Sequence, residues 1–570
     1  MKENIKRVAV IGAGTMGAAI AAHVANAGID VYLLDVAPKE LTPDEAARGL
    51  PLDHPLVRNR IVTQGWERCS KARPANLFCQ DLARRVTLGN LEDNLTWLSE
   101  ADWIVEAIVE RLDVKQQLMA QIDLLRKPGS IVSTNTSGIP IGAIAEGRSD
   151  DFKSHFLGTH AFNPPRYMKL LELIPHAGTD PAVIDMMKYF GTRTLGKGVV
   201  VCKDTPNFIA NRVLGLLGVY TMSYALDHGY SVEEVDALTG PAVGYPKTAT
   251  FRLYDLVGID VLELVTKNLY AAIPHDPYRE VLNHTKSLAL MEATIARNWL
   301  GNKTRQGFYK QVETPEGRQF WVLDAETMEY RAPVKVTFES MEEAGGSELG
   351  KRLRQLCAGN DRAAEFIWAT RSFGLNYAAS IIPEVADDLI SIDNACKWGF
   401  GHQMGPFETW DALGVAESVA RMEAEGKSVT PWVKEMLAHG FTTFYTHLNG
   451  RLHCYSPISK RYEPVGADPW AIVIEDLKKE EKRELKANAS ASLLDMGDGV
   501  LCLEFHSKAN SLNSQIFEML SITAEEMEKD WVGLIIGNQG KNFCAGADLT
   551  LFLDIIERQA WDEMEFLIRS

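Results

Sequence analysis

The side chains best suited to proton transfer in this chain are one histidine and one glutamate in neighbouring apolar segments. His160 lies in the segment 157–164, and Glu172 interrupts the apolar run 170–174. A carboxylate among leucines is costly to bury unless it is paired, and the imidazole one strand away is its nearest sensible partner. Such a pair fixes the histidine tautomer and stabilises an imidazolium. For a histidine without an acidic neighbour, the favoured interpretation is a hydrogen-bonded residue of the core. Because Glu172 lies beside it, the favoured interpretation of His160 is a general base.

A glycine-rich turn near the start of the chain predicts what such a base would work with. The apolar run 8–11 leads into Gly12-Ala13-Gly14-Thr15-Met16-Gly17, followed by an alanine-rich helix to about residue 27 and a strand over 31–34. Gly12 permits the tight turn, Gly14 lets the backbone approach a pyrophosphate, and Gly17 lets the helix pack close to the strand. The pattern predicts a bound dinucleotide; the alternative is an ordinary strand-to-helix turn.

Asp35 closes that second strand and predicts which dinucleotide binds. A carboxylate there hydrogen-bonds an adenosine ribose 2′-hydroxyl and repels a 2′-phosphate, and no arginine follows it, so NAD is favoured over NADP. NAD implies hydride transfer, which needs a base to take the proton of an alcohol. His160 is the candidate.

Composition excludes several other classes of protein. The chain has 570 residues and a net charge of −17, which argues against nucleic acid as a partner. Its eight cysteines show no C-x-x-C pair and no metal-like clustering with histidine, so we expect reduced thiols in a cytoplasmic protein and no metal. Residues 1–17 are interpreted as lacking an export signal. The longest apolar helix, residues 208–226, contains Asn211 and Arg212 and is expected in the core rather than in a membrane.

The order of patterns along the chain predicts an α/β doubly wound parallel sheet followed by helical domains. The spacing of residues predicts that the helical part is duplicated, because Asp236 and the segment 254–258 are matched by Asp393 and the segment 410–414. Hairpins are expected over 320–330 and at Asn449-Gly450, as connectors, and the charged run 478–486 as a solvated helix or linker. The expected domains are 1–202 (Rossmann type), 203–310 (helical), 311–359 (connector), 360–440 (second helical copy), 441–487 (hairpin and linker) and 488–570 (a last α/β segment).

Several of these segments together resemble the 3-hydroxyacyl-CoA dehydrogenase family. They are the glycine turn and the segments 105–110, 135–137, 158–164, 168–172, 204–212 and 301–309. The match spans about residues 5–310, and the segment 360–430 resembles the second helical copy of multifunctional β-oxidation enzymes.

The resemblance implies roles for individual residues. His160 would be the base and Glu172 its partner, with Ser137 and Asn211 hydrogen-bonding the hydroxyl and carbonyl oxygens of the substrate; the alternative for Ser137 and Asn211 is helix capping. The implied NAD contacts are Gly12, Gly14, Thr15, Met16, Gly17, Asp35, Ala107, Ile108, Val109, Glu110, Lys115, Asn135, Ser137 and Asn163. The alternative for Glu110 and Lys115 is an exposed ion pair.

A basic segment, residues 58–85, lies where the chain departs from short members of the family. It carries seven arginines and lysines against only Glu67 and Asp81. It is either a solvated helical face or a docking surface for the phosphates of a CoA thioester.

The last part of the chain offers a second resemblance. Residues 541–549, together with 510–513, look like the oxyanion segment of the enoyl-CoA hydratase (crotonase) family, in which the N–H at Ala547 would help to hold a thioester oxyanion. Because only about 85 residues of such a domain are present, we expect a truncated crotonase-like segment without hydratase activity.

These patterns lead to one expected function and two rivals. The expected function is NAD-dependent oxidation of (S)-3-hydroxyacyl-CoA to 3-oxoacyl-CoA in fatty-acid β-oxidation, with an acyl-CoA thioester as substrate and other β-oxidation enzymes as possible associates. The domain order resembles bacterial fused enzymes. One rival is a dehydrogenase of another small hydroxy acid, and the other is a non-catalytic scaffold that binds NAD and acyl-CoA.

Overall fold

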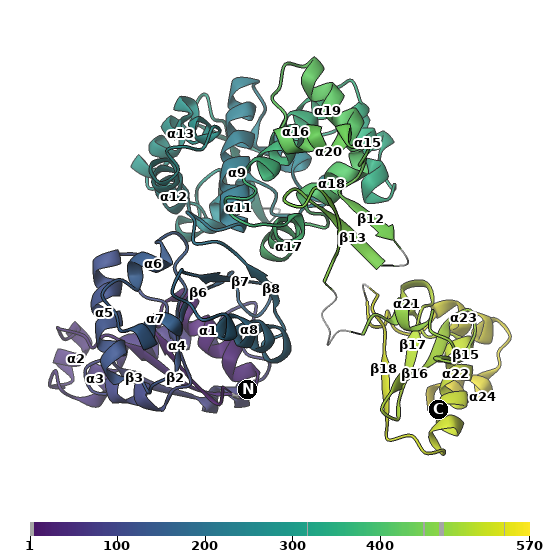
Figure 1. Ribbon diagram of the computed structural model, residues 1–570, viewed down its shortest axis with the longest axis horizontal. Helices are drawn as coiled ribbons and strands as arrows, with labels where there is room; N and C mark the ends of the chain where they lie inside the picture. The colour runs from purple at the N-terminus through teal and green to yellow at the C-terminus, as the bar shows by residue number, and fades with distance from the viewer. Residues whose placement is uncertain (1–4, 316, 449–450, 467–471, 541, 570) are drawn as a thin grey trace. The chain divides into compact units, whose positions relative to one another are not determined.

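The computed structural model describes residues 5–315, 317–448, 451–466, 472–540 and 542–569. The chain divides into two compact units, Met1–Pro464 and Val465–Ser570 (Figure 1). Each unit has a sheet and a core of its own, and each is described by itself.

The first unit begins with an eight-stranded sheet of order β3-β2-β1-β4-β5-β6-β7-β8. The strands are β1 (Arg7–Ile11), β2 (Asp30–Asp35), β3 (Val86–Asn90), β4 (Trp103–Glu106), β5 (Ile131–Thr134), β6 (Phe156–Ala161), β7 (Leu170–Pro175) and β8 (Gly198–Val201). The predicted parallel sheet is confirmed from β3 to β6. It is wrong for the last two strands, because β7 runs antiparallel to β6 and β8 parallel to β7. The loop between β6 and β7 is too short for the crossover helix that a parallel strand needs.

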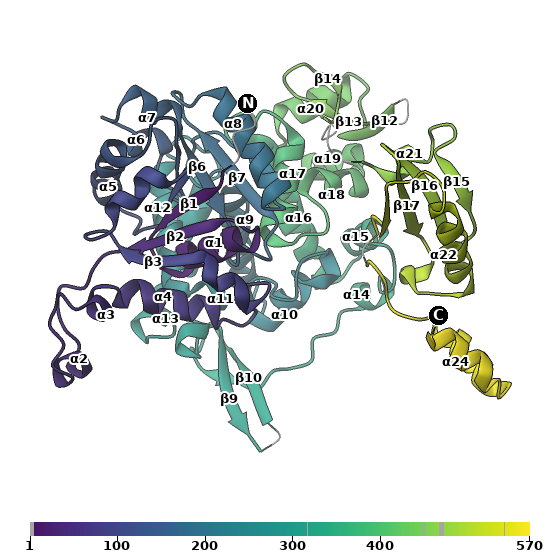
Figure 2. The same ribbon diagram turned by 90° about the horizontal axis from the view of Figure 1, so that it is seen from below.

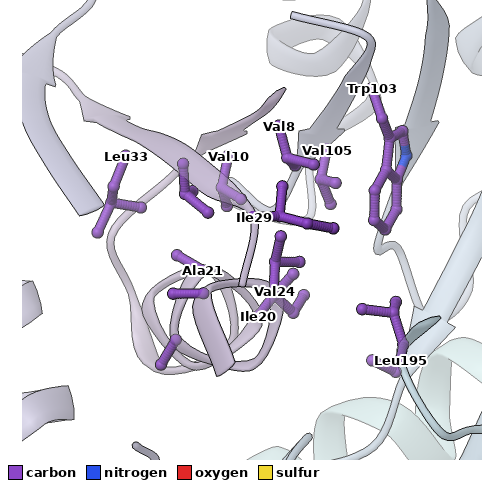
Figure 3. Close-up of a cluster of buried hydrophobic side chains, with 14 of the residues drawn as sticks. Val8, Val10, Ile20, Ala21, Val24, Ile29, Leu33, Trp103, Val105 and Leu195 are labelled. Carbon is purple, nitrogen blue, oxygen red and sulfur yellow. The ribbon is translucent and has the colours of Figure 1, made fainter. Parts of the chain in front are cut away.

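Helix α1 (Thr15–Asn26) packs its apolar face against the first strands of this sheet. Ile20 and Val24 belong to the same buried cluster as Val8, Val10 and Leu33 (Figure 3). Burying such side chains stabilises by about 1.5–3 kcal/mol each, which ties the glycine turn to the sheet. The other helices of this part are α2 (Pro43–Ala47), α3 (Pro55–Arg58), α4 (Arg60–Ser70), α5 (Leu112–Leu125), α6 (Ile141–Ile144), α7 (Asp150–Ser154) and α8 (Pro181–Tyr189).

The helical part contains two copies of one arrangement, as the aspartate spacing predicts. The first copy comprises α9 (Ala210–Asp227), α10 (Val232–Leu238), α11 (Phe251–Val257), α12 (Ile259–Ala272) and α13 (Thr285–Ala296). The second comprises α16 (Arg362–Ser380), α17 (Leu389–Phe400), α18 (Pro406–Leu413), α19 (Val415–Ala424) and α20 (Pro431–Ala438). Helices α14 (Glu339–Glu343) and α15 (Leu349–Ala358) lie between the copies in sequence.

The expected hairpins form two small antiparallel sheets, and each sheet follows one helical copy. The first has β9 (Tyr309–Thr314), β10 (Gly317–Leu323) and β11 (Tyr330–Arg331); the second has β12 (Tyr445–Leu448), β13 (Arg451–Ser456) and β14 (Arg461–Pro464). The turn expected at Asn449-Gly450 lies outside the described residues, although the strands on both sides of it pair. These strands do more than connect, because the first residue of each sheet hydrogen-bonds its own copy: the Tyr309 hydroxyl binds Asp236 and the Tyr445 hydroxyl binds Asp393.

The two copies pack on each other mainly through their longest helices, α9 and α16 (Figure 2). The buried guanidinium of Arg212 donates to Asp276 (2.7 Å) and to the Tyr377 hydroxyl (2.6 Å), so its charge is neutralised. Tyr220 stacks on Phe373 at 3.9 Å between ring centroids. These contacts hold α9 in place from the side that faces the second copy.

The second unit is built on a four-stranded sheet of order β15-β16-β17-β18. Its elements are α21 (Ile474–Leu477), β15 (Glu484–Ala487), β16 (Ala491–Gly497), β17 (Val500–Phe505), α22 (Ser514–Met527), β18 (Gly533–Gly537), α23 (Leu549–Glu557) and α24 (Trp561–Arg569). The strands expected over 500–505 and 532–536 are therefore present. The charged run 478–486 is not a helix: its last residues form the start of β15, which pairs with β16. In neither unit do the described residues include a helix long and apolar enough to span a bilayer.

Candidate active site

The reversal of strand direction after β6 places the predicted histidine and glutamate side by side. His160 and Glu172 are register partners in the antiparallel pair β6–β7. The His160 Nδ1 and Glu172 Oε2 atoms are 2.7 Å apart, and both side chains are buried. If the carboxylate is ionised, it accepts the Nδ1 proton, so the lone pair of the imidazole is on Nε2. That is the arrangement of a general base held by an acid.

The second oxygen of Glu172 is held by the start of α9. Its Oε1 accepts hydrogen bonds from the N–H groups of Ala210 (2.9 Å) and Ile209 (3.3 Å). Helix α9 begins at Ala210 and has no side-chain cap of its own. Glu172, which lies in strand β7, therefore caps this helix. These two donors fix the orientation of the Glu172 carboxyl group against the start of the helix. The thiol of Cys202 stays protonated nearby, because burial and the Glu172 charge raise its pKa.

Ser137 lies on the open side of the imidazole. Its hydroxyl oxygen is 3.1 Å from His160 Nε2, and the residue is exposed. The capping alternative for Ser137 is wrong, because α6 begins four residues later with Pro140 at its N-cap. Ser137, His160 and Glu172 thus form one hydrogen-bonded chain that runs from the surface to the interior.

The same edge of the sheet carries the glycine-rich turn. Strands β1, β4, β5 and β6 are parallel, so the segments after them, including the turn and Ser137, lie at their carboxyl ends, where ligands of open α/β sheets bind. A Cβ on Gly12 would collide with the carbonyl of Ala107, and one on Gly17 with the carbonyl of Gly12. A Cβ on Gly14 would meet nothing within 4 Å. The turn is therefore packed on its inner side and open at Gly14.

The first turn of α1 can accept a phosphate. Gly14 is its N-cap and offers no side-chain hydrogen bond, and no acidic residue lies in the first turn. Thr15 is exposed and Met16 partly exposed beside it. Free N–H groups at a helix start, with the positive end of the dipole, bind anions. These features fit the pyrophosphate of NAD.

Asp35 lies beside the same turn. Its carboxylate accepts hydrogen bonds from the N–H groups of Ala13 (2.6 Å) and Val36 (2.7 Å). Two donors keep it oriented at the end of β2, and it remains partly exposed. A carboxylate accepts more than two hydrogen bonds, so Asp35 keeps capacity for a ribose hydroxyl.

Lys115 is buried rather than exposed, which corrects one alternative from the sequence. Its ammonium group lies 2.7 Å from Glu106 Oε1 and 3.4 Å from Glu110 Oε2, with the side chain 1% exposed. Glu106 is not among the residues predicted from the sequence, although an acid at the end of an apolar strand needs a partner. Glu106 also accepts from the N–H of Ile108 (2.7 Å) and the hydroxyl of Thr134 (2.6 Å), so it fixes the loop after β4.

Glu110 joins that loop to the loop after β5. Its Oε1 accepts hydrogen bonds from the Thr136 hydroxyl and from the N–H of Ser137 (3.0 Å). Asn135 accepts the N–H of Ala161 at 3.0 Å and so connects the same loop to the end of β6. The loops after three strands are therefore linked around the exposed Ser137.

The remaining predicted residues border this cluster. Asn163 is exposed just after β6, Val109 is exposed after β4, and Ala107 and Ile108 are partly exposed. Asn211 follows Ala210, which binds Glu172, so it lies at the start of α9. The capping alternative for Asn211 is wrong, because it is the second helical residue and not the N-cap.

The basic segment 58–85 is largely neutralised. Arg58 pairs with Glu92 and Asp93, Arg60 with Glu45, Lys71 with Glu67, and Arg85 with Asp30. Arg68, Arg73 and Arg84 are exposed. Arg166, from the loop after His160, donates to the carbonyl oxygens of Ala75 (2.6 Å) and Leu77 (2.7 Å) and so attaches this segment to the loop after β6.

The fold and the site together define a dinucleotide-binding dehydrogenase. The chain matches two family models, "3-hydroxyacyl-CoA dehydrogenase, NAD binding domain" over residues 7–205 and "3-hydroxyacyl-CoA dehydrogenase, C-terminal domain" over residues 208–311. It is 44% identical over 571 residues to a probable 3-hydroxyacyl-CoA dehydrogenase of Bacillus subtilis, covering 100% of this chain and 71% of that protein. The chain belongs to the 3-hydroxyacyl-CoA dehydrogenase family, which makes it an oxidoreductase whose first domain binds NAD.

Two further relatives match beyond the first helical copy. A putative fatty acid oxidation complex trifunctional enzyme of Rickettsia felis is 32% identical over 578 residues, with 100% of this chain and 72% of that protein covered. The crystal structure of 3-hydroxybutyryl-CoA dehydrogenase from Escherichia coli covers 77% of this chain and 100% of its own, with a TM-score of 0.53 and 23% identity. This structural likeness concerns the fold alone.

Proposed function

We propose that this protein oxidises the 3-hydroxyl group of (S)-3-hydroxyacyl-CoA to a 3-oxo group, as a step of fatty-acid β-oxidation. The observation that carries the proposal is the hydrogen-bonded chain Ser137–His160–Glu172, which is closed at its buried end by the first N–H groups of α9. A protein that only binds its ligands has no need of a buried base with its own orienting acid. This argues against the scaffold.

Each residue of this hydrogen-bonded series has a role in the proposed reaction. His160 Nε2 takes the hydroxyl proton, and Glu172 stabilises the imidazolium that results. Ser137 and Asn211 hydrogen-bond the substrate oxygens and orient the carbon that is oxidised. When NAD is bound, it supplies the acceptor for the hydride.

We propose the following contacts with NAD. Gly12, Gly14, Thr15, Met16 and Gly17 would hold the pyrophosphate at the start of α1. Asp35 would bind the adenosine ribose and Glu110 the nicotinamide ribose. Ala107, Ile108, Val109, Lys115, Asn135 and Asn163 would form or support the remaining wall of the nucleotide site.

Following NADH absorbance with acetoacetyl-CoA tests the proposal. His160→Ala should lower turnover by roughly three to four powers of ten and leave NAD binding intact, whereas Asp35→Ala should mainly weaken NAD binding. Equal losses in both assays would indicate misfolding. Turnover of free hydroxy acids without turnover of CoA thioesters would favour the rival dehydrogenase.

We further propose that the exposed basic residues of the segment 58–85 contact the phosphates of CoA. The support is that three arginines there have no ion pair among the described residues and that Arg166 attaches the segment to the loop after β6. Lys71→Glu combined with Arg73→Glu should raise the KM for the CoA thioester and spare the KM for NAD. An unchanged KM would remove this part of the proposal.

We also propose that the second unit is crotonase-like and that the protein works in the cytoplasm of a bacterium with other β-oxidation enzymes. The support in the second unit is local. Leu512 pairs with the segment around Ala547, through Leu512 N–H to Gly546 (2.9 Å) and Asp548 N–H to Leu512 (2.8 Å). Of the motif 541–549, Lys541 lies outside the described residues. Adding crotonyl-CoA and recording its enoyl absorbance tests the expectation that this segment has no hydratase activity. We expect no loss of absorbance, and hydration would contradict that expectation.

A further inference from the structure

Asn207 lies at the active site with two features that folding alone does not require. Its backbone is left-handed, with φ at 61°, and Phe208 after it is left-handed too, at 53°. Its side-chain Nδ2 atom is buried and has no hydrogen-bond partner among the described residues. Glycine at this position would avoid both penalties, because it accepts a positive φ and brings no amide to bury.

The position of Asn207 links its amide to the reacting groups. Its Oδ1 atom lies 3.1 Å from the point that a Cβ on Gly138 would occupy, so the amide is against the residue that follows Ser137. The ring of Phe208 is 5.6 Å from the His160 ring between centroids. Ile209 and Ala210, two and three residues after Asn207, donate their N–H groups to Glu172. The unpartnered amide is thus enclosed between the serine turn and the start of α9.

We propose that the Asn207 amide donates a hydrogen bond to the thioester carbonyl of the acyl-CoA substrate, in addition to the one expected from Asn211. This inference rests on the proposed function, because it takes the 3-hydroxyl of the substrate to lie at His160 and Ser137. The thioester carbonyl is two carbons away from the reacting carbon, so its oxygen lies close to the serine turn, and its two lone pairs can accept from Asn207 as well as from Asn211. The amide of Asn207 is a buried donor there with no partner in the protein.

The substrate is favoured over NAD as the acceptor because of the element that carries Asn207. The expected nucleotide contacts come from the loops after β1, β2, β4 and β5 and from the loop after β6. Asn207 instead lies on the segment between β8 and α9, at the beginning of the helical part. A donor at this place favours 3-oxoacyl and 3-hydroxyacyl thioesters over compounds that lack the thioester carbonyl.

The decisive experiment combines one substitution with one change in the substrate. Asn207→Gly removes the amide without straining the left-handed backbone. It is compared with wild type on acetoacetyl-CoA and on 3-oxobutyl-CoA, a thioether in which a methylene replaces the thioester carbonyl. We expect Asn207→Gly to lower kcat/KM for acetoacetyl-CoA by roughly ten- to a hundredfold, and to change kcat/KM for the thioether less than threefold.

Asn298→Gly is the matched control. Asn298 also has a left-handed backbone (φ 57°), is exposed, and lies after α13 away from the site, so both kinetic constants should stay at wild-type values. Equal losses on both substrates, a loss in thermal midpoint without any kinetic change, or a raised KM for NADH alone would each overturn the assignment. A wild-type protein that turns over neither compound would instead refute the proposed function.

Discussion

The two helical copies share a set of hydrogen bonds between aspartates and their small sheets, here called the polar frame. They differ in the contacts made by the start of the leading helix, which is α9 in the first copy and α16 in the second. In the first copy, Asp255 accepts the N–H groups of Phe308 and Tyr309, both at 2.8 Å. In the second copy, Asp411 accepts those of Phe444 and Tyr445, at 2.7 and 2.9 Å. The hydroxyls of these tyrosines then bind Asp236 and Asp393, respectively. The duplication has therefore kept the four aspartates that join each helical copy to its small sheet.

The start of the leading helix differs between the copies. Helix α9 has no side-chain cap, and its first N–H groups bind Glu172. Helix α16 is capped by its own Asp361, which accepts the N–H of Ala364 at 2.9 Å. Of the two leading helices, α9 alone therefore hydrogen-bonds a residue of the candidate active site through its first N–H groups. The comparison indicates that a helix becomes part of a site when its local cap is missing and another element supplies the acid.

The second copy still contributes to the site by packing. Gly399, near the end of α17, lies close to Ala210, Phe162 and Leu170. The ring of Phe400 is edge-on to that of Phe162, at 5.7 Å between centroids, and Phe162 in turn contacts His160 at 4.6 Å. The second copy thus packs against the loop that follows His160.

The largest effect on this comparison is expected when the acid that binds each helix start is removed. Glu172→Gln should lower kcat by roughly a hundredfold to ten-thousandfold, because the imidazole loses its orienting charge. Asp361→Ala removes the equivalent acid from the second copy; it should cost about 1–2 kcal/mol of stability and leave kcat within twofold. Steady-state kinetics with acetoacetyl-CoA and denaturant unfolding measure the two quantities. A comparable fall in kcat in both variants would refute the distinction between the copies.

The next effect measures the support that the second copy gives. Gly399→Val should lower kcat by about tenfold, because added methyl groups would press on Leu170 and Ala210 and shift Glu172. Gly374→Val is the control: Gly374 also lies in a helix of the second copy, but its neighbour is Leu217 on the far side of the copy interface. The control should lose stability and keep its kcat. If both variants keep wild-type kcat, the packing behind His160 is not needed for catalysis.

Much of this comparison could be predicted from the sequence. Glycines and an acid at fixed spacing define the nucleotide turn, and two aspartates with their Tyr-Asp or Trp-Asp partners mark the duplication. The His160–Glu172 pair was found because an acid in an apolar strand needs a partner. Each of these signals is local or repeats at a constant interval, so a single chain is enough to reveal it.

The parts that could not be predicted depend on contacts between distant segments. The burial of Lys115 follows from the docking of α5 on the end of β4, which helical periodicity does not specify. The left-handed backbone of Asn207 follows from the turn between β8 and α9, and an asparagine in the sequence does not by itself predict this conformation. Nor does the spacing of the basic segment reveal the acids from outside it that neutralise its arginines.

A smaller effect concerns the pH dependence of stability. Burial raises the pKa of Asp393 to about 7, against an ordinary value near 3.8. Between these two values, the folded chain holds a proton that the unfolded chain has released. The free energy of unfolding should therefore fall as the pH rises from about 4 to about 7, by at most about 1.4 kcal/mol per pH unit, and this contribution should stay lost above pH 7.

Asp393→Asn removes this titration, so denaturant midpoints of the wild type and the variant at pH 5, 6, 7 and 8 isolate it. The stability advantage of the wild type over the variant should shrink as the pH rises to 7. Asp236→Asn is the partner in the first copy, where burial raises the pKa to about 6, so its window should close about one unit lower. Parallel pH profiles of wild type and Asp393→Asn would contradict the raised pKa.

The smallest effect tests whether the shared frame is worth the same in both copies. Tyr309→Phe and Tyr445→Phe each remove one hydroxyl that donates to a buried aspartate, at 2.8 and 2.9 Å. Each should cost about 1–3 kcal/mol, because the carboxylate loses a donor in a place that water does not reach easily. The two losses should agree within about 0.5 kcal/mol, and the double variant should lose their sum, since the two aspartates share no partner. A loss confined to Tyr309→Phe would mean that the second copy folds without its frame, and that the likeness of the two networks is geometric rather than energetic.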